Sequence, residues 1–306
     1  MSWYPLVLTP QIGRRVLVTG ANAGLGFFTA ARLAGAGAHV VLSGRSPERL
    51  DAAAAAIRSV RPAASVETLV MDVSSLASVA AGAERLLESP QLDGVVANAG
   101  MVHPPMTRRE SVDGNELVLA TNVLGHVALL GRLLPRLAPG ARIVSLGSLA
   151  TRLSTFRVDD LQLERGYDPW RAYAQSKIAT QVFAFELDRR LRAAGSHVAS
   201  VVAHPGYSIS GRTPHVPGVN EPSRGGRFAD ALQAMWAQGK HRGAEVALHA
   251  LTAPEVEGGQ YWGPRYLTRG EPALHRPTRV STDPAIAARF WTFAEAVTGR
   301  AFTVGG

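Results

Sequence analysis

Short apolar runs alternate with longer segments of helical spacing through the first two-thirds of the chain. The runs are rich in Val, Leu and Ile without a polar alternation, which is typical of strands buried on both faces. They predict strands at Arg15–Thr19, His39–Ser43, Val66–Met71, Gly94–Asn98, Arg142–Leu146 and His197–Ala203. The segments between them predict helices, for example at Leu25–Gly37, Pro47–Arg61 and Leu76–Glu88.

Strands that alternate with helices form βαβ units, and right-handed crossovers then place helices on both faces of a parallel sheet. The sequence therefore predicts an α/β fold, a doubly wound Rossmann-type sheet of about seven strands. We find no internal repeat or low-complexity tract, so we expect one domain over residues 1–306. Further helices are expected around Asp113–Leu137, Pro169–Ala194, Gly243–Thr252 and Pro284–Thr298, with a last apolar run at Gly259–Trp262.

Composition narrows the classes of function. The chain has no cysteine, which excludes disulfides, thiol catalysis and iron–sulfur clusters. Its formal net charge is +8, but the arginines are scattered and no basic run is interleaved with aromatic residues, so we expect no nucleic-acid partner. The histidines show no HxxxH spacing, so no metal is expected. We see neither a signal peptide nor a run near the roughly 20 apolar residues of a membrane span, which favours a cytoplasmic protein without a membrane partner.

A glycine-rich turn follows the first predicted strand directly. The turn contains Gly20, Asn22, Gly24, Leu25 and Gly26 and leads into a helical pattern. Glycines let backbone N–H groups approach a pyrophosphate, which the positive end of the helix also attracts. A glycine pattern alone is weak, but the strand before it and the helix after it predict nucleotide binding here.

The second predicted strand ends in Ser43-Gly44-Arg45. Sites for NAD usually have an acidic residue at this point, which accepts hydrogen bonds from the ribose 2′-hydroxyl. This chain has Arg45 instead, and a guanidinium suits a 2′-phosphate. We therefore expect NADP(H) as cofactor, although an ordinary surface arginine would look the same in the sequence.

Taken in order, the motifs resemble the short-chain dehydrogenase/reductase family over most of the chain. The resemblance assigns Asp72-Val73 to the adenine side of the cofactor, Asn98-Ala99-Gly100 to the fourth-strand motif and Pro205-Gly206 to the nicotinamide contact. It also assigns Asn122, Ser148, Tyr173 and Lys177 to the catalytic tetrad. Asp72 could instead cap the following turn. Ser210 is a candidate hydroxyl donor to the nicotinamide carboxamide or the pyrophosphate.

Tyr173 and Lys177 are four residues apart and so lie on one face of a helix. An ammonium and an oxidised nicotinamide both favour phenolate, so we expect a lowered Tyr173 pKa and a role as general acid/base. Ser148 would hydrogen-bond the substrate oxygen, and Asn122 would hold a water linking Lys177 to solvent. A Tyr–Lys pair alone is more often a surface pair. Together with Ser148 and the glycine-rich turn, it becomes a candidate active site.

Tyr173 follows Ser148 by 25 positions, a longer interval than in the small members of the family. The additional segment, about residues 151–170, resembles the retinol-dehydrogenase-like branch, which includes protochlorophyllide reductases. This resemblance implies a bulky, rather apolar substrate. The aromatic residues of the insertion could line the substrate pocket or only pack inside the protein. Residues of about 207–240 are expected to form a lid, with Met235 and Trp236 as candidate pocket walls.

The sequence thus favours NADP(H)-dependent hydride transfer to or from a carbonyl or secondary alcohol. Two alternatives stay open: reduction of an imine or an activated C=C bond, and a catalytically silent NADPH-sensing regulator. The partner expected is a small-molecule substrate. A homo-oligomer and a monomer are both compatible with the sequence.

Overall fold

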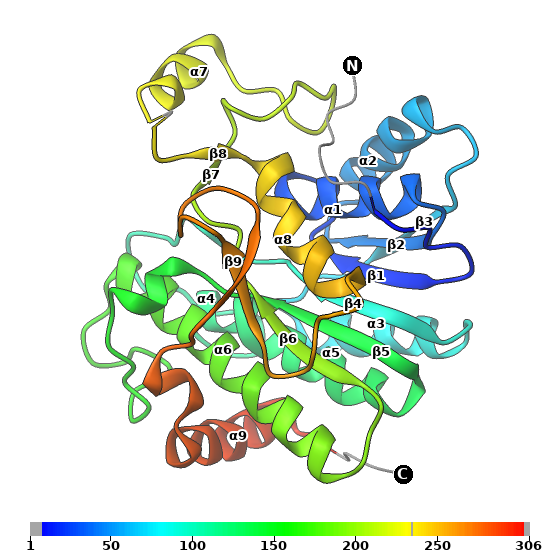
Figure 1. The fold of residues 1–306 in the computed structure, drawn as a ribbon. Helices are drawn as coiled ribbons and strands as arrows, with labels where there is room; N and C mark the ends of the chain where they lie inside the picture. Colours follow the sequence, from blue (N-terminus) through cyan, green and yellow to red (C-terminus); the bar gives the residue numbers. More distant parts are fainter. Residues whose placement is uncertain (1–7, 234, 303–306) are drawn as a thin grey trace.

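The computed structural model describes residues 8–233 and 235–302, and an eight-stranded sheet forms its centre (Figure 1). The strand order is β10-β9-β6-β5-β4-β1-β2-β3. Seven strands are parallel, as predicted, and β10 is added antiparallel at the edge. The strands are β1 (Arg15–Thr19), β2 (His39–Gly44), β3 (Val66–Val70), β4 (Leu92–Ala97), β5 (Leu137–Leu146), β6 (Ala199–Ala203), β9 (Tyr261–Pro264) and β10 (Pro272–His275).

Helices cover both faces of the sheet, which confirms the doubly wound prediction. One face packs against α1 (Gly24–Gly35), α2 (Pro47–Val60) and α8 (Lys240–Thr252). The other packs against α3 (Leu76–Leu87), α5 (Gly125–Leu133), α6 (Pro169–Ala193) and α9 (Pro284–Thr298). Strand β1 serves both layers, because Val16 and Val18 point into one apolar core and Leu17 into the other.

The helix expected around Asp113–Leu137 begins later, at Leu117, and is not uniform. It consists of α4 (Leu117–Leu119), a π-helical turn (Ala120–Leu124), α5 and a 3-10 turn (Leu134–Arg136). The Glu116 carboxylate caps the start of α4 by accepting hydrogen bonds from the N–H groups of Val118 and Leu119 at 2.9 and 2.7 Å. The expectation that no run comes near the length of a membrane span was wrong for this segment, since Leu117–Arg136 is long and apolar enough to cross a membrane. However, 83% of its most apolar window is buried inside the fold, as in a core helix.

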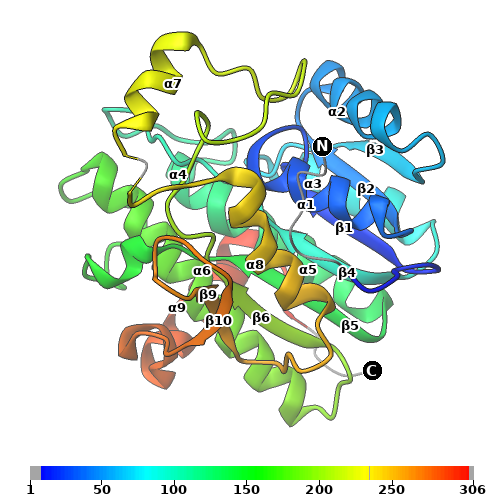
Figure 2. The ribbon, with the colours of Figure 1, turned by 45° about the horizontal axis from the view of Figure 1, so that its top comes forward.

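Between β6 and α8 the chain forms the segment expected to be a lid (Figure 2). It contains two short paired strands, β7 (Ser208–Ile209) and β8 (Gln238–Gly239), and a helix, α7 (Arg224–Ala231). No helix was predicted within the lid, so α7 differs from the prediction; its start is capped by Ser223 and it buries no residue. Helix α7 is only eight residues long and contains Gly225 and Gly226, and glycine is a poor helix former, so its helical signal in the sequence is weak.

Candidate active site

The chain order reverses between β1 and β4, where crossovers leave the sheet in opposite directions, and this opens a crevice at the carboxyl ends of both strands. The glycine turn lies at this point. Gly20 and Gly24 have φ values of +65° and +59°, which side chains other than glycine rarely adopt. A Cβ on Gly26 would lie 2.4 Å from the Gly20 carbonyl oxygen. Bare backbone is therefore required along the turn.

The start of α1 has the donors that an anion needs. Helices α2, α3, α6 and α9 begin with a serine or aspartate whose side chain caps the first turn. Helix α1 begins after Ala23, which offers no side-chain acceptor. The first N–H groups of α1, from Gly24, Leu25 and Gly26, are thus left for another acceptor, and a pyrophosphate fits them. Asn22 packs beside the end of β2, where its Oδ1 would be 3.0 Å from a Cβ on Gly44.

Thr19, the last residue of β1, fixes the neighbouring strand end. Its Oγ1 accepts hydrogen bonds from the backbone N–H groups of Asn98 and Ala99, each at 3.0 Å. The Asn98 side chain donates from Nδ2 to the Thr19 carbonyl oxygen at 2.7 Å. Asn98 therefore shapes the crevice through the backbone of β1.

Arg45, Asp72 and Val73, which the sequence predicts on the adenine side of the cofactor, differ in their exposure and contacts. Arg45 follows β2 and is exposed, with no ion pair to any residue that the structure describes. The Asp72 carboxylate accepts the N–H and the hydroxyl of Ser74 at 2.9 and 2.7 Å, so it does cap the turn before α3. Val73 is buried, and its carbonyl oxygen lies against Gly125 of α5.

Three of the predicted site residues lie near the end of β5 and on α6: Ser148, Tyr173 and Lys177. The Tyr173 hydroxyl donates to Ser148 Oγ at 3.1 Å. Lys177, one turn further along α6, is buried and donates from Nζ to the Leu146 carbonyl oxygen at 2.7 Å. The helix that the sequence predicts here thus brings the Tyr–Lys pair to the serine, and a solvated surface pair is ruled out by the burial of Lys177.

The protonation of this pair differs from the expectation. Burial raises the pKa of Tyr173, and the hydrogen bond with Ser148 opposes that effect only in part. Burial also lowers the pKa of Lys177 to about 8. The Lys177 ammonium, which donates to the Leu146 carbonyl oxygen, does not offset the effect of burial on the Tyr173 pKa.

Asn122 lies in the π-helical turn, and its side chain is fully engaged. Its Oδ1 accepts the Met101 N–H at 2.6 Å, while Nδ2 donates to the Met101 carbonyl oxygen at 3.2 Å and to Ser176 Oγ at 2.8 Å. A Cβ on Gly100 would lie 3.1 Å from Asn122 Oδ1 and 3.7 Å from Lys177 Nζ. The structure therefore brings Asn122 and Lys177 together around Gly100, as the resemblance implies.

His126 was missed by the sequence analysis, although it follows Asn122 by four residues and so shares its helix face. The ring is buried, with Nδ1 3.3 Å from the Asn122 carbonyl oxygen and Nε2 2.9 Å from Thr19 Oγ1. Since a carbonyl only accepts, Nδ1 carries the proton and Thr19 donates to Nε2. Burial, in particular, lowers the His126 pKa to about 4, so the ring is a neutral bridge between β1 and the π-helical turn.

A buried chain of hydrogen bonds also reaches Ser148 from the C-terminal region. Ser281, in the 3-10 turn Arg279–Thr282, donates to Gln181 Oε1 at 2.8 Å. Gln181 Nε2 donates to Thr151 Oγ1 at 3.3 Å, and the Thr151 hydroxyl donates to the Ser148 carbonyl oxygen at 2.9 Å. Gln181 follows Lys177 by one helical turn, a spacing that could have singled it out.

The turn after β6 forms the other wall of the crevice. Gly206 has a φ of +66°, and its N–H donates to His204 Nδ1 at 3.3 Å. The Pro205 carbonyl oxygen accepts from Ser208 Oγ and Gln238 Nε2, each at 2.9 Å, which ties the turn to both lid strands. The backbone carbonyl of Ser210 accepts the N–H of Thr213 at 3.0 Å. Its side chain makes no contact that decides between its two expected roles.

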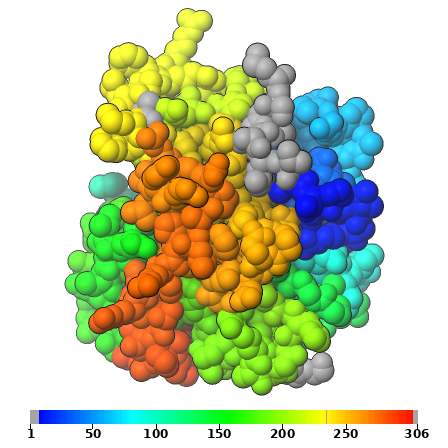
Figure 3. All heavy atoms as spheres, in the orientation of Figure 1, coloured from blue at the N-terminus to red at the C-terminus, as the bar shows by residue number. Residues whose placement is uncertain are grey.

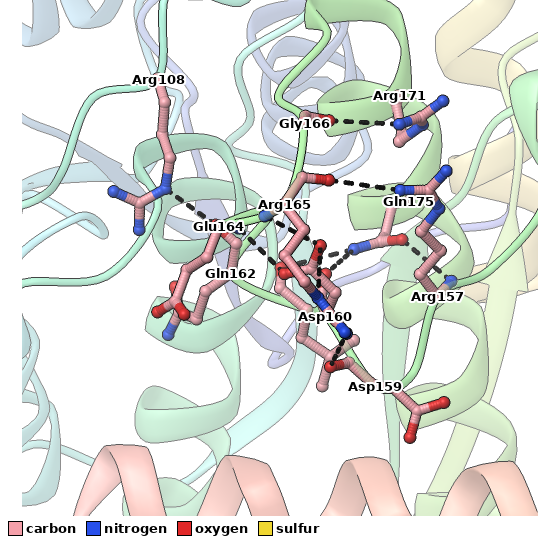
Figure 4. Close-up of polar contacts among 11 residues, drawn as sticks. Arg108, Arg157, Asp159, Asp160, Gln162, Glu164, Arg165, Gly166, Arg171 and Gln175 are labelled. Atoms are coloured by element: carbon pink, nitrogen blue, oxygen red, sulfur yellow. Dashed lines mark hydrogen bonds and ion pairs between the residues drawn. The ribbon is translucent and has the colours of Figure 1, made fainter.

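The insertion of residues 151–170 folds against the start of α6 (Figure 4). Asp160 accepts the N–H groups of Glu164 and Arg165 at 2.9 and 3.2 Å, and its carbonyl oxygen accepts from Gln175 Nε2 at 2.9 Å. Four of its large apolar side chains pack into the protein interior, which favours the packing role for them: Phe156, Leu161, Leu163 and Tyr167. Trp170 differs, because it is half exposed and its ring centroid is 6.3 Å from that of Tyr173.

Comparison with known proteins matches this geometry. Residues 14–216 match the family model described as short chain dehydrogenase. The chain belongs to that family. Mouse polyprenol dehydrogenase is 36% identical over 303 residues, covering 96% of this chain and 87% of that protein. Mouse retinol dehydrogenase 14 is 34% identical and covers 94% and 86%. A solved structure from Mycobacterium paratuberculosis, described as an uncharacterised protein, superposes with a TM-score of 0.78 at 33% identity and 97% coverage of both chains.

Membership in the short chain dehydrogenase family makes the protein an oxidoreductase whose fold binds a nicotinamide cofactor. The two mouse relatives confirm the resemblance to the retinol-dehydrogenase-like branch. The geometry of the crevice also fits the cofactor, because Gly20 and Gly26 leave no room for a side chain and the start of α1 has no internal cap.

Proposed function

We propose that the protein transfers a hydride between NADP(H) and a carbonyl or secondary alcohol on a medium-sized to bulky, rather apolar substrate. The observation that carries this proposal is the contact between the Tyr173 hydroxyl and Ser148 Oγ, with buried Lys177 one turn away on the same helix. A protein that only bound the nucleotide would have no use for a buried proton donor beside a second hydroxyl.

The bound nicotinamide supplies or accepts the hydride. In the direction of reduction, Ser148 holds the substrate oxygen by a hydrogen bond and Tyr173 donates its proton to the forming alkoxide. Burial keeps Tyr173 protonated until the substrate oxygen takes that proton. Lys177, with its pKa near 8, is suited to return a proton to Tyr173 near neutral pH.

Two features support the finer parts of the proposal. Exposed Arg45 at the end of β2 suits the 2′-phosphate of NADP(H), with no internal carboxylate competing for it. For the substrate, apolar side chains stand exposed around the crevice and lid, among them Trp170, Phe228, Met235 and Trp236. The two mouse relatives are named for polyprenol and retinol, both lipophilic alcohols.

The test uses Tyr173→Phe, which removes only the proton donor. We expect NADPH binding, followed by the quenching of tryptophan fluorescence, to stay within about twofold of wild type, while turnover of a panel of apolar ketones and aldehydes falls by about 10²-fold or more. Ser148→Ala should lower turnover in the same panel. Undiminished turnover by Tyr173→Phe would refute the proposed chemistry.

A further inference from the structure

Lys240 lies over the glycine turn, at the junction between the lid and α8. A Cβ on Gly24 would lie 3.7 Å from Lys240 Cδ and 3.9 Å from Lys240 Nζ, and no other described atom outside the turn comes within 4 Å of that position. One lysine side chain thus covers the point where α1 begins. Figure 3 shows this lid-to-α8 region as part of a continuous surface with the loop before β10.

Three contacts of Lys240 and its neighbours in the chain hold it in this place. Its N–H donates to Thr213 Oγ1 at 2.8 Å. Gln238, two residues earlier, donates from Nε2 to the Pro205 carbonyl oxygen. One turn into α8, a Cβ on Gly243 would lie 2.9 Å from Leu25 Cδ2, so α8 packs closely on α1. The position of Lys240 is therefore set by the walls of the crevice.

The charge of Lys240 has no internal counterpart. Among residues 8–233 and 235–302, no carboxylate lies within ion-pair distance of its ammonium. Burial lowers its pKa, and the more distant charge of Asp230 opposes that effect. An ammonium held partly out of water beside the positive end of α1 is unfavourable unless an anion joins them.

We propose that Lys240 binds the pyrophosphate of the nicotinamide dinucleotide from the lid side, opposite the N–H groups of the glycine turn. The inference rests on the cofactor part of the proposed function and not on the substrate. Two sets of donors then share the phosphate oxygens, the fixed amides of α1 and the ammonium from α8. Cofactor binding consequently fastens the C-terminal end of the lid.

Binding measurements test this with Lys240→Met, which keeps the apolar stem, and Lys240→Arg, which keeps the charge. Arg242→Met is the matched control, because it removes a charge two residues away that pairs with Glu245 at 3.5 Å. We expect Lys240→Met to raise the Kd for NADPH and for ADP-ribose alike, by about 10- to 100-fold, since both carry the pyrophosphate. Lys240→Arg and Arg242→Met should change either Kd by less than about threefold.

The outcomes are separable. Unchanged affinity of Lys240→Met for both ligands, or a loss confined to NADPH, overturns the inference and leaves the proposed function intact. A wild-type protein that binds neither ligand overturns both.

A spectroscopic measurement gives a second readout that needs no turnover. The chain has only two lysines, Lys177 and Lys240, so reductive methylation with ¹³C-formaldehyde gives few resonances, and Lys240→Arg assigns them. We expect NADP⁺ or ADP-ribose to raise the Lys240 pKa by about one unit or more, as an anion within contact distance does. A Lys240 titration that neither ligand changes would overturn the inference.

Discussion

Replacing His126 by phenylalanine tests the neutral histidine bridge inside the protein. The change keeps a ring of similar size but removes the hydrogen bonds to Thr19 Oγ1 and to the Asn122 carbonyl oxygen. Each buried group left without a partner costs about 1–3 kcal/mol. The Thr19 hydroxyl has a second acceptor, the Val96 carbonyl oxygen at 3.4 Å, so the cost of losing the bond to His126 is reduced. We therefore expect the free energy of unfolding at pH 7 to fall by about 2–4 kcal/mol.

The pH dependence of the free energy of unfolding separates the effect of histidine protonation from the loss of the two hydrogen bonds. The His126 pKa drops from an ordinary value of 6.5 to about 4 in the folded protein. Between these values the unfolded chain takes up a proton that the folded protein does not. The stability owed to the neutral ring is therefore complete above the unfolded pKa and is lost as the pH falls toward 4. Linkage gives a loss of about 2 kcal/mol between pH 7 and pH 5 for this one group.

Urea unfolding at pH 7 and pH 5, followed by tryptophan fluorescence, measures both effects. All other titrating groups are common to the two proteins, so their contributions cancel in the difference. We expect wild type to lose about 2 kcal/mol more than His126→Phe over this interval. If the two proteins lose equal stability, His126 is not the buried neutral group described here.

Three further predictions concern the cofactor, the serine and the fold. Arg45→Ala should raise the Kd for NADPH by about 10- to 100-fold and leave the Kd for NADH within about twofold, since a charge-assisted contact is worth about 1.5–3 kcal/mol; equal effects on both would contradict a 2′-phosphate contact. Gln181→Met should lower kcat more than it raises KM, because it frees Thr151 and with it Ser148; urea unfolding should show a loss of about 2 kcal/mol, and an unchanged kcat would count against the positioning role. Gly125→Ala gains about 1 kcal/mol of helix propensity, but its Cβ would lie 1.8 Å from the Val73 carbonyl oxygen. The steric strain should therefore outweigh the gain in helix propensity and lower the thermal unfolding midpoint. A midpoint at or above that of wild type would disprove the close packing.

Periodicity was sufficient for the parts of the fold that bury apolar surface. Strand β1 and helix α9 have the predicted bounds, since each runs continuously through a core and ends at a clear capping or turn signal. Strand β10 and helix α7 were missed for the opposite reason. Strand β10 has four residues and is half-buried at the sheet edge, and α7 is short, buries no residue and contains two glycines, so neither gives a strong signal in its sequence.

The candidate site divides in a similar way. The glycine turn and the Tyr173–Lys177 pair are local in sequence, and their spacing indicates their geometry. His126 and Gln181 act through partners more than 25 residues away, Thr19 for one and Ser281 for the other. The helical spacing from Asn122 and from Lys177 could mark both residues as candidates, but only the fold brings them to their distant partners, so their roles could not be predicted. The contact of Lys177 with the Leu146 carbonyl oxygen joins residues 31 positions apart, so the local spacing of the Tyr173–Lys177 pair could not predict it.

Tyr173 and Lys177 on α6 contribute unequally to the stability of the fold. Among the residues that the structure describes, the Tyr173 hydroxyl donates only to Ser148 Oγ. Loss of the tyrosine oxygen therefore frees another hydroxyl, which can turn to water. The Lys177 ammonium donates a hydrogen bond to the last residue of the central strand β5. Removing it would take this donor from the buried Leu146 carbonyl oxygen, which would destabilise the fold. A lineage that abandoned the chemistry but kept the fold would therefore lose the tyrosine first and retain the lysine long afterwards. Inactive descendants of this protein should be recognisable by a phenylalanine one turn before a surviving lysine.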